Sequence, residues 1–117
     1  MNTWPNTASP GRFIVLEVSV QLIEELVDVV ERIRKKDAGL AKQIRASASS
    51  VALNIGEGSR RRGGSKTYHY RVAAGSADET KCALRVAVAW RYVGKEDVVR
   101  CLELVDRINA MLHRLTR

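Results

Sequence analysis

The sequence predicts an all-α protein, built as an antiparallel four-helix bundle with up-down-up-down order, and three observations predict it. Apolar residues recur every three or four positions over four successive segments, which is the spacing of amphipathic helices. Pro5 and Pro10 are the two prolines and both precede those segments, so no proline interrupts a later helix. The segments are joined by short connections, and short connections favour antiparallel neighbours.

The 117 residues are enough for one domain. Residues 1–12 lack periodicity and are expected to form a flexible leader, whereas residues 13–117 are expected to form the bundle. No run of about 18 apolar residues is present, so the sequence predicts neither a signal peptide nor a membrane span. Two cysteines, Cys82 and Cys101, are too few for a disulfide scaffold, and a reducing cytoplasmic location is expected.

The first helix is expected over residues 14–36. Acidic residues lie mainly in its first half and basic residues at its end, which suits the helix dipole. The basic end, residues 32–36, therefore has a structural explanation, with a nucleic-acid contact as the alternative. Residues 37–39 are expected to form the turn that follows. The apolar residues expected in the core are Val15, Val18, Leu22, Leu26, Val29 and Ile33.

The second helix carries two stripes of different character. One is apolar and is expected to face the core: Leu40, Ile44, Ala48, Val51 and Ile55. The other has small or amide side chains where a solvated face would carry Lys and Glu: Gln43, Ser47, Ser50 and Asn54. This second stripe either packs tightly inside the subunit or forms a subunit interface. Gly56 and Gly58 are expected to end the helix.

The third helix is expected over residues 66–93, with Gly94 ending it. Gly75 lies in its middle, where glycine costs up to about 1 kcal/mol relative to alanine. Close approach of the second helix is expected to offset that cost. Glu96 and Asp97 then start the fourth helix in a position that the dipole favours. The core residues expected from these two helices are Tyr70, Ala73, Ala77, Leu84 and Val88, then Val98, Leu102, Val105, Ile108, Leu112 and Leu115.

Positive charge is concentrated in the middle of the chain. Residues 38–95 contain 11 Lys and Arg against three acids, whereas the other residues contain nine against 10. The densest cluster is Arg60, Arg61, Arg62 and Lys66. Clustered arginine with a pI of about 9.9 is typical of surfaces that bind polyanions. The alternative for these arginines is a solvated loop.

Aromatic side chains follow this cluster at Tyr68, His69 and Tyr70. They could stack on an unpaired base. The alternative is that they are core or capping residues at the start of the third helix.

A specific set of residues carries a resemblance to a known family: Gln43, Ile44, Arg45, Ser50, Asn54, Ile55, Glu57 and Gly58, then Ala73, Gly75, Ser76, Glu79 and Leu84. In this set and its spacing, residues 14–115 resemble the 23S rRNA intervening-sequence proteins, a family of four-helix bundles. That family is similar to the accessory variability proteins of diversity-generating retroelements. The chain departs from the pattern at Ala52, Gly56 and Thr80, which concern helix packing more than chemistry.

The resemblance implies two properties beyond the fold. Relatives form homopentameric barrels, so a homo-oligomer is expected. The retroelement accessory proteins use a basic surface to bind nucleic acid and a partner reverse transcriptase. The resemblance therefore implies RNA, DNA or a hybrid as the ligand, and such an enzyme as a further partner.

Catalytic interpretations fail on spacing. The segment from Gly58 to Thr67 has a serine where a phosphate-binding loop needs glycine before the lysine, and it follows a helix rather than a strand. His69, His113 and the cysteines lack metal-ligand spacing, so neither a metal nor another cofactor is expected. Glu57 and Glu79 are isolated carboxylates that pair with arginines or helix ends, or, if buried, join a structural polar network with Ser50, Asn54 and Ser76.

The sequence therefore predicts a non-enzymatic, oligomeric helical bundle that binds nucleic acid through a basic surface, as an accessory factor to a reverse transcriptase or an rRNA-associated element. The alternative is a structural oligomer whose basic helical hairpin, residues 38–95, docks an acidic protein. The residues assigned to nucleic-acid binding are Arg60, Arg61, Arg62 and Lys66, with Arg45, Arg71 and Arg85 secondary.

Overall fold

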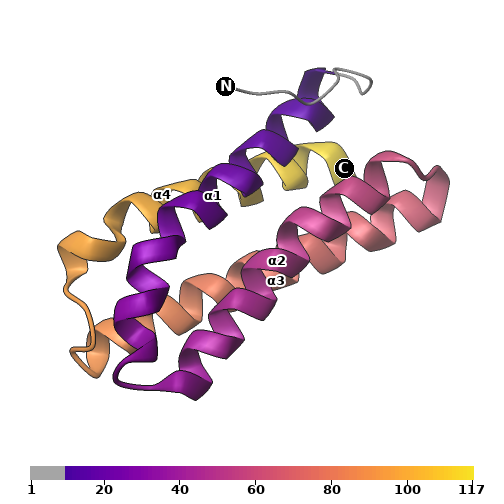
Figure 1. Ribbon diagram of the computed structural model, residues 1–117. Coiled ribbons are helices and arrows are strands. Elements are labelled where there is room, and N and C mark those ends of the chain that lie inside the picture. The colour runs from indigo at the N-terminus through magenta and orange to yellow at the C-terminus, as the bar shows by residue number, and fades with distance from the viewer. Residues whose placement is uncertain (1–9) are drawn as a thin grey trace.

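The computed structural model describes residues 10–117, with side chains from residue 14 onward. Over that range it contains four helices and no strand (Figure 1). They are α1 (Pro10–Arg34), α2 (Ala38–Ser59), α3 (Gly63–Ala89) and α4 (Lys95–Thr116). The connections comprise residues 35–37, 60–62 and 90–94. The predicted all-α class with four helices is confirmed.

Each helix packs mainly against two others. The principal contacts join α1 with α2, α2 with α3, α3 with α4, and α4 with α1. In Figure 1 the chain turns back at each connection, so helices that follow one another in sequence lie side by side. The face between α1 and α2 is therefore opposite the face between α3 and α4.

The core is aliphatic because the apolar stripes of all four helices meet inside this arrangement. Every apolar residue predicted for the core of α1 and α2 is buried. Three of the predicted core residues, Val88, Leu102 and Leu115, are only half buried at the edge of the core. Tyr70 is the largest side chain of the fully buried set.

Helix α1 begins earlier than expected. It starts at Pro10 rather than Ile14, since the fixed φ of proline suits the first helical position, where no amide donor is needed. Residues 10–12 are therefore helical, although they were assigned to the leader. The rest of the predicted leader, residues 1–9, lies outside the described residues.

Helix α3 ends four residues earlier than expected, at Ala89 rather than Val93. Arg91 takes a left-handed conformation with φ 64°, and its amide donates to the Val88 carbonyl over 2.9 Å. The Tyr92 amide donates to the Ala87 carbonyl over 3.0 Å. These two bonds form a Schellman motif, a helix stop that usually has glycine where Arg91 stands.

Gly94 has a different role from the one predicted. It is the N-cap of α4, and its amide donates to an Asp97 carboxylate oxygen over 2.8 Å. At the start of α2 the roles are reversed, because the carboxylate of the N-cap residue, Asp37, accepts from the Leu40 amide over 3.0 Å.

Two glycine predictions are wrong. α2 continues to Ser59, so Gly56 and Gly58 lie inside the helix rather than ending it. Gly75 is exposed, and a Cβ atom there would have no neighbour within 4 Å among the described residues, so the predicted close contact at this glycine is absent. The close approach occurs at Gly58, where a Cβ atom would lie 2.7 Å from the Tyr70 ring.

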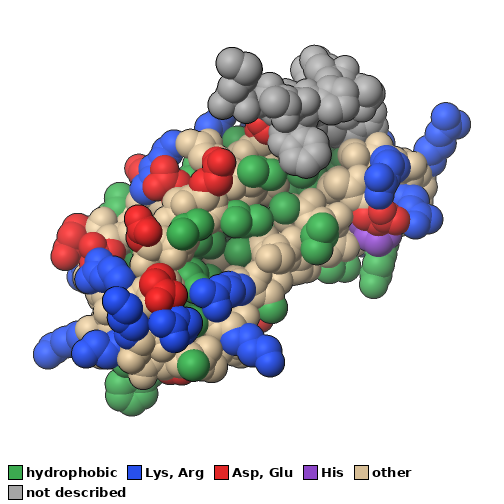
Figure 2. All heavy atoms as spheres, viewed as in Figure 1, with side chains coloured by type: hydrophobic (Ala, Val, Ile, Leu, Met, Phe, Trp, Pro, Cys, Tyr) green, Lys and Arg blue, Asp and Glu red, His purple; other side chains and the backbone are tan. Residues whose placement is uncertain are grey.

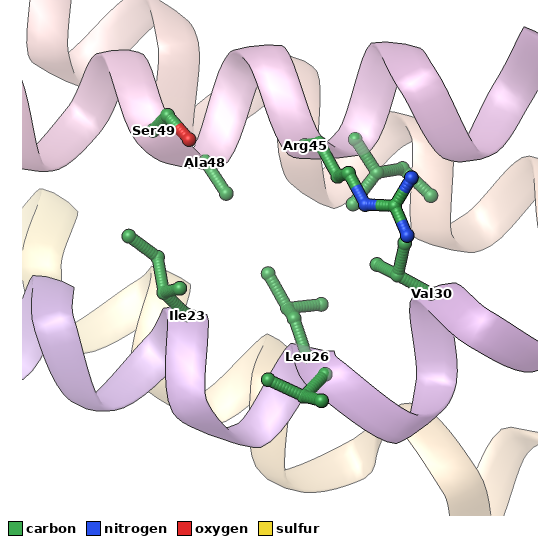
Figure 3. Close-up of a pocket in the computed structure, with 8 residues that line it drawn as sticks. Ile23, Leu26, Val30, Arg45, Ala48 and Ser49 are labelled. Carbon is green, nitrogen blue, oxygen red and sulfur yellow. The ribbon is translucent and has the colours of Figure 1, made fainter.

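Shallow grooves lie where neighbouring helices diverge. The groove between α1 and α2 encloses about 290 Å³ and is lined by apolar side chains such as Ile23 and Leu26, with Arg45 at one end (Figure 3). Figure 2 shows that Lys and Arg side chains gather toward the two ends of the bundle.

Candidate nucleic-acid interface

The α2–α3 turn, residues 60–62, consists of three exposed arginines. Arg60 caps α2, with its amide donating to the Glu57 carbonyl, and Arg62 has extended backbone just before α3. Gly63 follows with φ +58°, a conformation that glycine adopts without a Cβ penalty. A tight reversal therefore presents three guanidinium groups at one end of the bundle.

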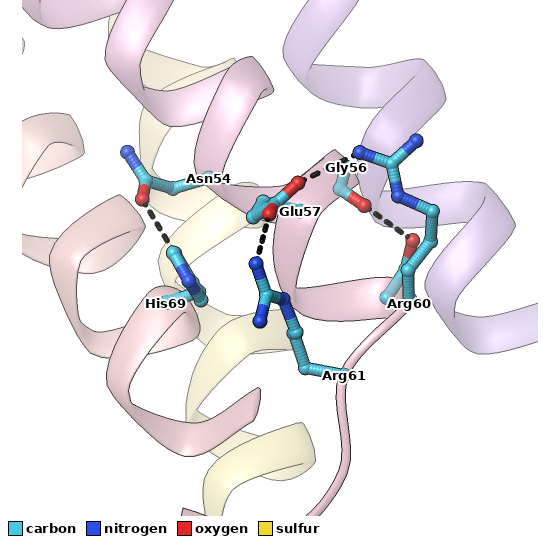
Figure 4. Close-up of polar contacts among 7 residues, drawn as sticks. Asn54, Gly56, Glu57, Arg60, Arg61 and His69 are labelled. Atoms are coloured by element: carbon cyan, nitrogen blue, oxygen red, sulfur yellow. Dashed lines mark hydrogen bonds and ion pairs between the residues drawn. The ribbon is translucent and has the colours of Figure 1, made fainter. Parts of the chain in front are cut away.

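Glu57 holds two of these arginines. Its carboxylate accepts from Arg60 over 2.7 Å and from Arg61 over 2.5 Å, one contact for each oxygen (Figure 4). The hydrogen bonds from Arg61 and then Arg60 lower the pKa of the Glu57 carboxyl to about 2. The pairs are largely exposed and so contribute little to stability. The ion pairs instead hold the two arginine side chains in place and neutralise part of their charge.

Arg62 and Lys66 differ from that pair, because within residues 10–117 neither forms an ion pair. Arg62 is exposed and Lys66 is half exposed on the first turn of α3. Together with the two tethered arginines they leave a net positive cluster. The structure therefore brings together the four residues assigned to primary binding.

A line of polar contacts joins α2 to α3. Ser47 and Thr80 share a buried hydrogen bond of 2.7 Å, and Ser50 and Ser76 share one of 2.8 Å. Ser47 and Ser50 of the predicted stripe thus contact α3 within the subunit, whereas Gln43 of the same stripe is exposed. Thr80 is one of the positions at which the chain departs from the family pattern, and its buried hydroxyl has a partner in Ser47.

The same line continues toward the turn through Asn54. Its amide nitrogen donates to the Ser50 carbonyl over 2.9 Å, and its amide oxygen lies 3.0 Å from Nδ1 of His69 (Figure 4). Ser50, Asn54 and Ser76 therefore form the predicted polar network. His69, Ser47 and Thr80 also belong to it, although the sequence prediction omitted them.

Both glutamates assigned to that network lie outside it. Glu57 pairs with the turn arginines, one of the alternatives considered from the sequence. Glu79 is exposed on α3 and, within the described residues, makes no ion pair. Within the described residues, neither carboxylate hydrogen-bonds to Ser50, Asn54 or Ser76.

The three aromatic residues after the turn have three different environments. Tyr70 is 1% exposed and belongs to the core, as one alternative predicted. His69 is half buried and bonded to Asn54. Tyr68 is 63% exposed, with its ring edge-on to His69 at a centroid distance of 5.3 Å. Tyr68 is thus the one ring of the three open to an unpaired base.

The secondary arginines do not extend the cluster. Arg45 lies in the α1–α2 groove, 3.9 Å from the Glu31 carboxylate. Arg71 and Arg85 line separate grooves between α3 and α4, on the opposite face. Charge in the hairpin is therefore distributed over opposite faces, which a sequence count cannot reveal because it ignores the direction of each side chain.

The histidines, cysteines and carboxylates of the described residues are dispersed. No group of three or more His, Cys, Asp or Glu residues within them could hold a metal ion. Cys82 is exposed and Cys101 is buried, and burial raises the pKa of the Cys101 thiol to about 11. None of α1–α4 is long and apolar enough to cross a membrane.

Comparison with known proteins places this geometry in a family. One solved structure that resembles the chain is a protein of unknown function from the S23 ribosomal protein family of Bacteroides thetaiotaomicron. It superposes with a TM-score of 0.82 at 21% identity, over 88% of this chain and 98% of the other. No curated protein matches the chain. The profile of the 23S rRNA-intervening sequence proteins matches residues 12–114, so the chain belongs to the 23S rRNA-intervening sequence protein family.

Proposed function

We propose that this protein is a non-enzymatic helical bundle that binds nucleic acid through the α2–α3 turn. The observation that carries the proposal is the meeting of Arg60, Arg61, Arg62 and Lys66 at one end of the bundle, with one carboxylate, Glu57, among them. Guanidinium groups suit phosphate oxygens because they donate in a planar fork. Phosphate binding by such a cluster releases counterions and depends little on sequence.

The proposed ligand has accessible bases beside the phosphates. Tyr68 lies two residues after Lys66 and is 63% exposed, so a base could stack on it while the turn holds the neighbouring phosphates. RNA, DNA and a hybrid meet this description where they carry unpaired bases. By resemblance to the retroelement proteins, the cellular role is that of an accessory factor to a reverse transcriptase or an rRNA-associated element in the cytoplasm.

Self-association is the second part of the proposal. The reversal of the chain at each connection in Figure 1 supports an antiparallel, up-down-up-down protomer. Large apolar side chains remain exposed on its outside, among them Leu53 at 72% and Val86 at 40%. A second copy covering such side chains would remove them from water. Resemblance to pentameric relatives makes a homopentamer the expected assembly.

Fluorescence anisotropy with short RNA, DNA and hybrid duplexes tests nucleic-acid binding. The wild type is compared with a variant in which Arg60, Arg61 and Arg62 are changed to alanine, and light scattering checks that both assemble alike. Binding near physiological salt that is lost in an intact variant supports the proposal. Weak binding by both proteins would favour the other class of function, in which the basic turn docks an acidic protein.

A further inference from the structure

A second set of chemistry-bearing residues lies at the opposite end of the bundle, in the α3–α4 connection. Trp90 is 68% exposed, although tryptophan is usually covered in a monomer. Its ring stacks on that of Tyr92, with 6.5 Å between centroids and 18° between planes. Tyr92 fixes this arrangement because its hydroxyl donates to an Asp37 carboxylate oxygen over 3.2 Å. The result is an aromatic surface that is exposed to solvent and held in place by this hydrogen bond.

The backbone at this surface carries a conformational cost. Arg91 lies between the two rings in sequence and is the one non-glycine residue of the described chain with positive φ, at 64°. Such a conformation is unfavourable for a side chain with a Cβ atom, and glycine usually takes this place after a helix. An arginine at a position that favours glycine is explained if its guanidinium group has a function.

Exposed cations lie in or next to the two connections at this end of the bundle. The hydrogen bond from Tyr92 to Asp37 joins this connection to the one after α1, where Lys35 and Lys36 are exposed. Arg91 and Lys95 are exposed as well. Across residues 10–117 none of these four cations forms an ion pair. At the α2–α3 turn, by contrast, Glu57 holds two of the three arginines.

The acids of this end are largely engaged. Asp37 caps α2 and accepts from Tyr92, and Asp97 caps α4 and pairs with Arg32 over 3.0 Å. Glu31 pairs with Arg34 over 2.7 Å. Glu96 is the remaining exposed carboxylate, beside Lys95. The free charge around Trp90 is thus positive, which suits phosphates rather than an apolar or basic protein surface.

We propose that Trp90, Arg91 and the neighbouring lysines form a site for a single-stranded nucleic-acid segment. One unpaired base stacks on the free face of the Trp90 indole, while Arg91 and Lys95 contact the flanking phosphates and Lys36 the next phosphate. Stacking on an aromatic ring is tolerant of sequence, because every base has a π-face. The site therefore selects unpaired over paired strands rather than a particular sequence.

This site takes the ligand class of the proposed function but is separate from the α2–α3 turn. The 27 residues of α3 lie between the two, which at 1.5 Å per residue is about 40 Å. The α2–α3 turn would hold phosphates of either strand form, with Tyr68 beside them, whereas binding at the site around Trp90 requires an unpaired base. The two sites can therefore be removed independently.

The test measures binding of a fluorescein-labelled dodecamer of thymidylate and of a 12-base-pair duplex by anisotropy. The variants are Trp90→Leu, Trp90→Phe, Arg91→Gly and the triple alanine variant of the α2–α3 turn. Arg107→Ala is the control for general loss of charge, because Arg107 lies elsewhere on α4, is exposed and forms no ion pair within the described residues. Light scattering records the assembly of each variant. Trp90 is exposed, so replacing it should leave the fold intact.

The proposal predicts that Trp90→Leu weakens binding of the single strand about tenfold, the effect of losing one stacked base, while duplex binding is unchanged. Trp90→Phe should retain most of the affinity. Arg91→Gly should weaken single-strand binding more than Arg107→Ala does. The triple alanine variant should lose duplex affinity and keep the preference for the single strand.

Two results would overturn it. One is equal single-strand affinity for wild type and Trp90→Leu. The other is a change of assembly without a change of binding, which would place Trp90 in a protein contact instead. Loss of single-strand binding in Trp90→Leu together with full affinity in the triple alanine variant would contradict the proposed role of the turn but support this site.

Discussion

Gly58 lies between the α2–α3 turn and the core, and it allows α2 to pack closely against Tyr70 of α3. A Cβ atom at this position would meet the Tyr70 ring at 2.7 Å, and Tyr70 is buried, so the ring cannot move away cheaply. We expect Gly58→Ala to lower the free energy of unfolding by roughly 1–3 kcal/mol, the usual cost of overpacking. Denaturant titration measures it.

Gly56 supplies the matched control two residues away in the same helix. A Cβ atom there would have no neighbour within 4 Å. Gly56→Ala should therefore raise the free energy of unfolding by up to about 1 kcal/mol through helix propensity. Equal effects of the two substitutions would show that the contact with Tyr70 does not constrain the helix pair.

The ion pairs of Glu57 predict a pH dependence. Because its pKa falls from 4.5 to about 2 on folding, the unfolded chain binds more protons than the folded chain between those values. The stability that the pairs contribute is thus fully present above about pH 4.5 and is lost as pH falls toward 2.

Thermal unfolding of wild type and Glu57→Gln over a pH series measures this contribution. Wild type should have the higher midpoint at neutral pH, and the difference should shrink steadily as Glu57 becomes protonated. A difference that stays constant from about pH 6 down to the acid limit would show that Arg60 and Arg61 do not pair with this carboxylate in solution.

At the level of single residues, buried apolar side chains are easier to predict from the sequence than functional side chains. Periodicity located the core positions of α1 and α2 because burial there depends only on the helical repeat. It could not predict that Arg91 takes a left-handed conformation, since Gly94 is the stronger local stop signal. Nor could it show which cations Glu57 partly neutralises.

The contact between α2 and α3 depends on paired hydroxyls, and Ser47 and Thr80 provide its buried example. Thr80→Val alone, or Ser47→Ala alone, should lower the free energy of unfolding by about 1 kcal/mol, because one hydroxyl loses its partner. The double variant should cost less than the sum, because no hydroxyl is then left without its partner. A double-mutant cycle from urea unfolding measures the coupling, and strict additivity would contradict it.

The end of α3 allows a second test, which concerns the left-handed conformation of Arg91. Arg91→Gly should raise the free energy of unfolding by about 1 kcal/mol, since glycine relieves the left-handed conformation. Arg107→Gly is the same change within helix α4 and should lower it by about 1 kcal/mol. Thermal unfolding gives both values, and destabilisation by both changes would contradict the strained cap.

The helices themselves were predictable, whereas their ends were less so. Capping by Asp37 and Asp97 uses side chains that sequence signals identify, yet α1 starts at Pro10 and α3 stops at Ala89. Both differences come from backbone geometry that hydrophobic periodicity does not report. The hydroxyl pairs were only partly predictable, because the partner of each serine depends on the register between helices.

For the whole molecule, the structure shows how the positive charge is distributed over the surface. The formal charge of +7 does not form one continuous basic face. Basic clusters occur at the two ends of the bundle, while Arg45 and Arg85 lie on opposite faces. A polyanion would therefore contact an end of each protomer, and an assembly would multiply those contacts.

Self-association predicts a mass well above the 13.0 kDa of one chain in light scattering. Val86→Glu should lower that mass if the outside of α3 is covered by a second copy, because a carboxylate would be buried there. Val27→Glu is the control, since this valine is 63% exposed on α1, the helix diagonal to α3. Equal masses for all three proteins would exclude this face of α3.

The most direct measurement of the central claim is the slope of log affinity against log salt concentration for a short duplex. Each phosphate contact contributes about −0.9 to that slope for DNA. The account predicts that changing Arg60, Arg61 and Arg62 to alanine makes the slope shallower by roughly one to three, with assembly unchanged. An identical slope and affinity in wild type and variant would contradict binding by the α2–α3 turn.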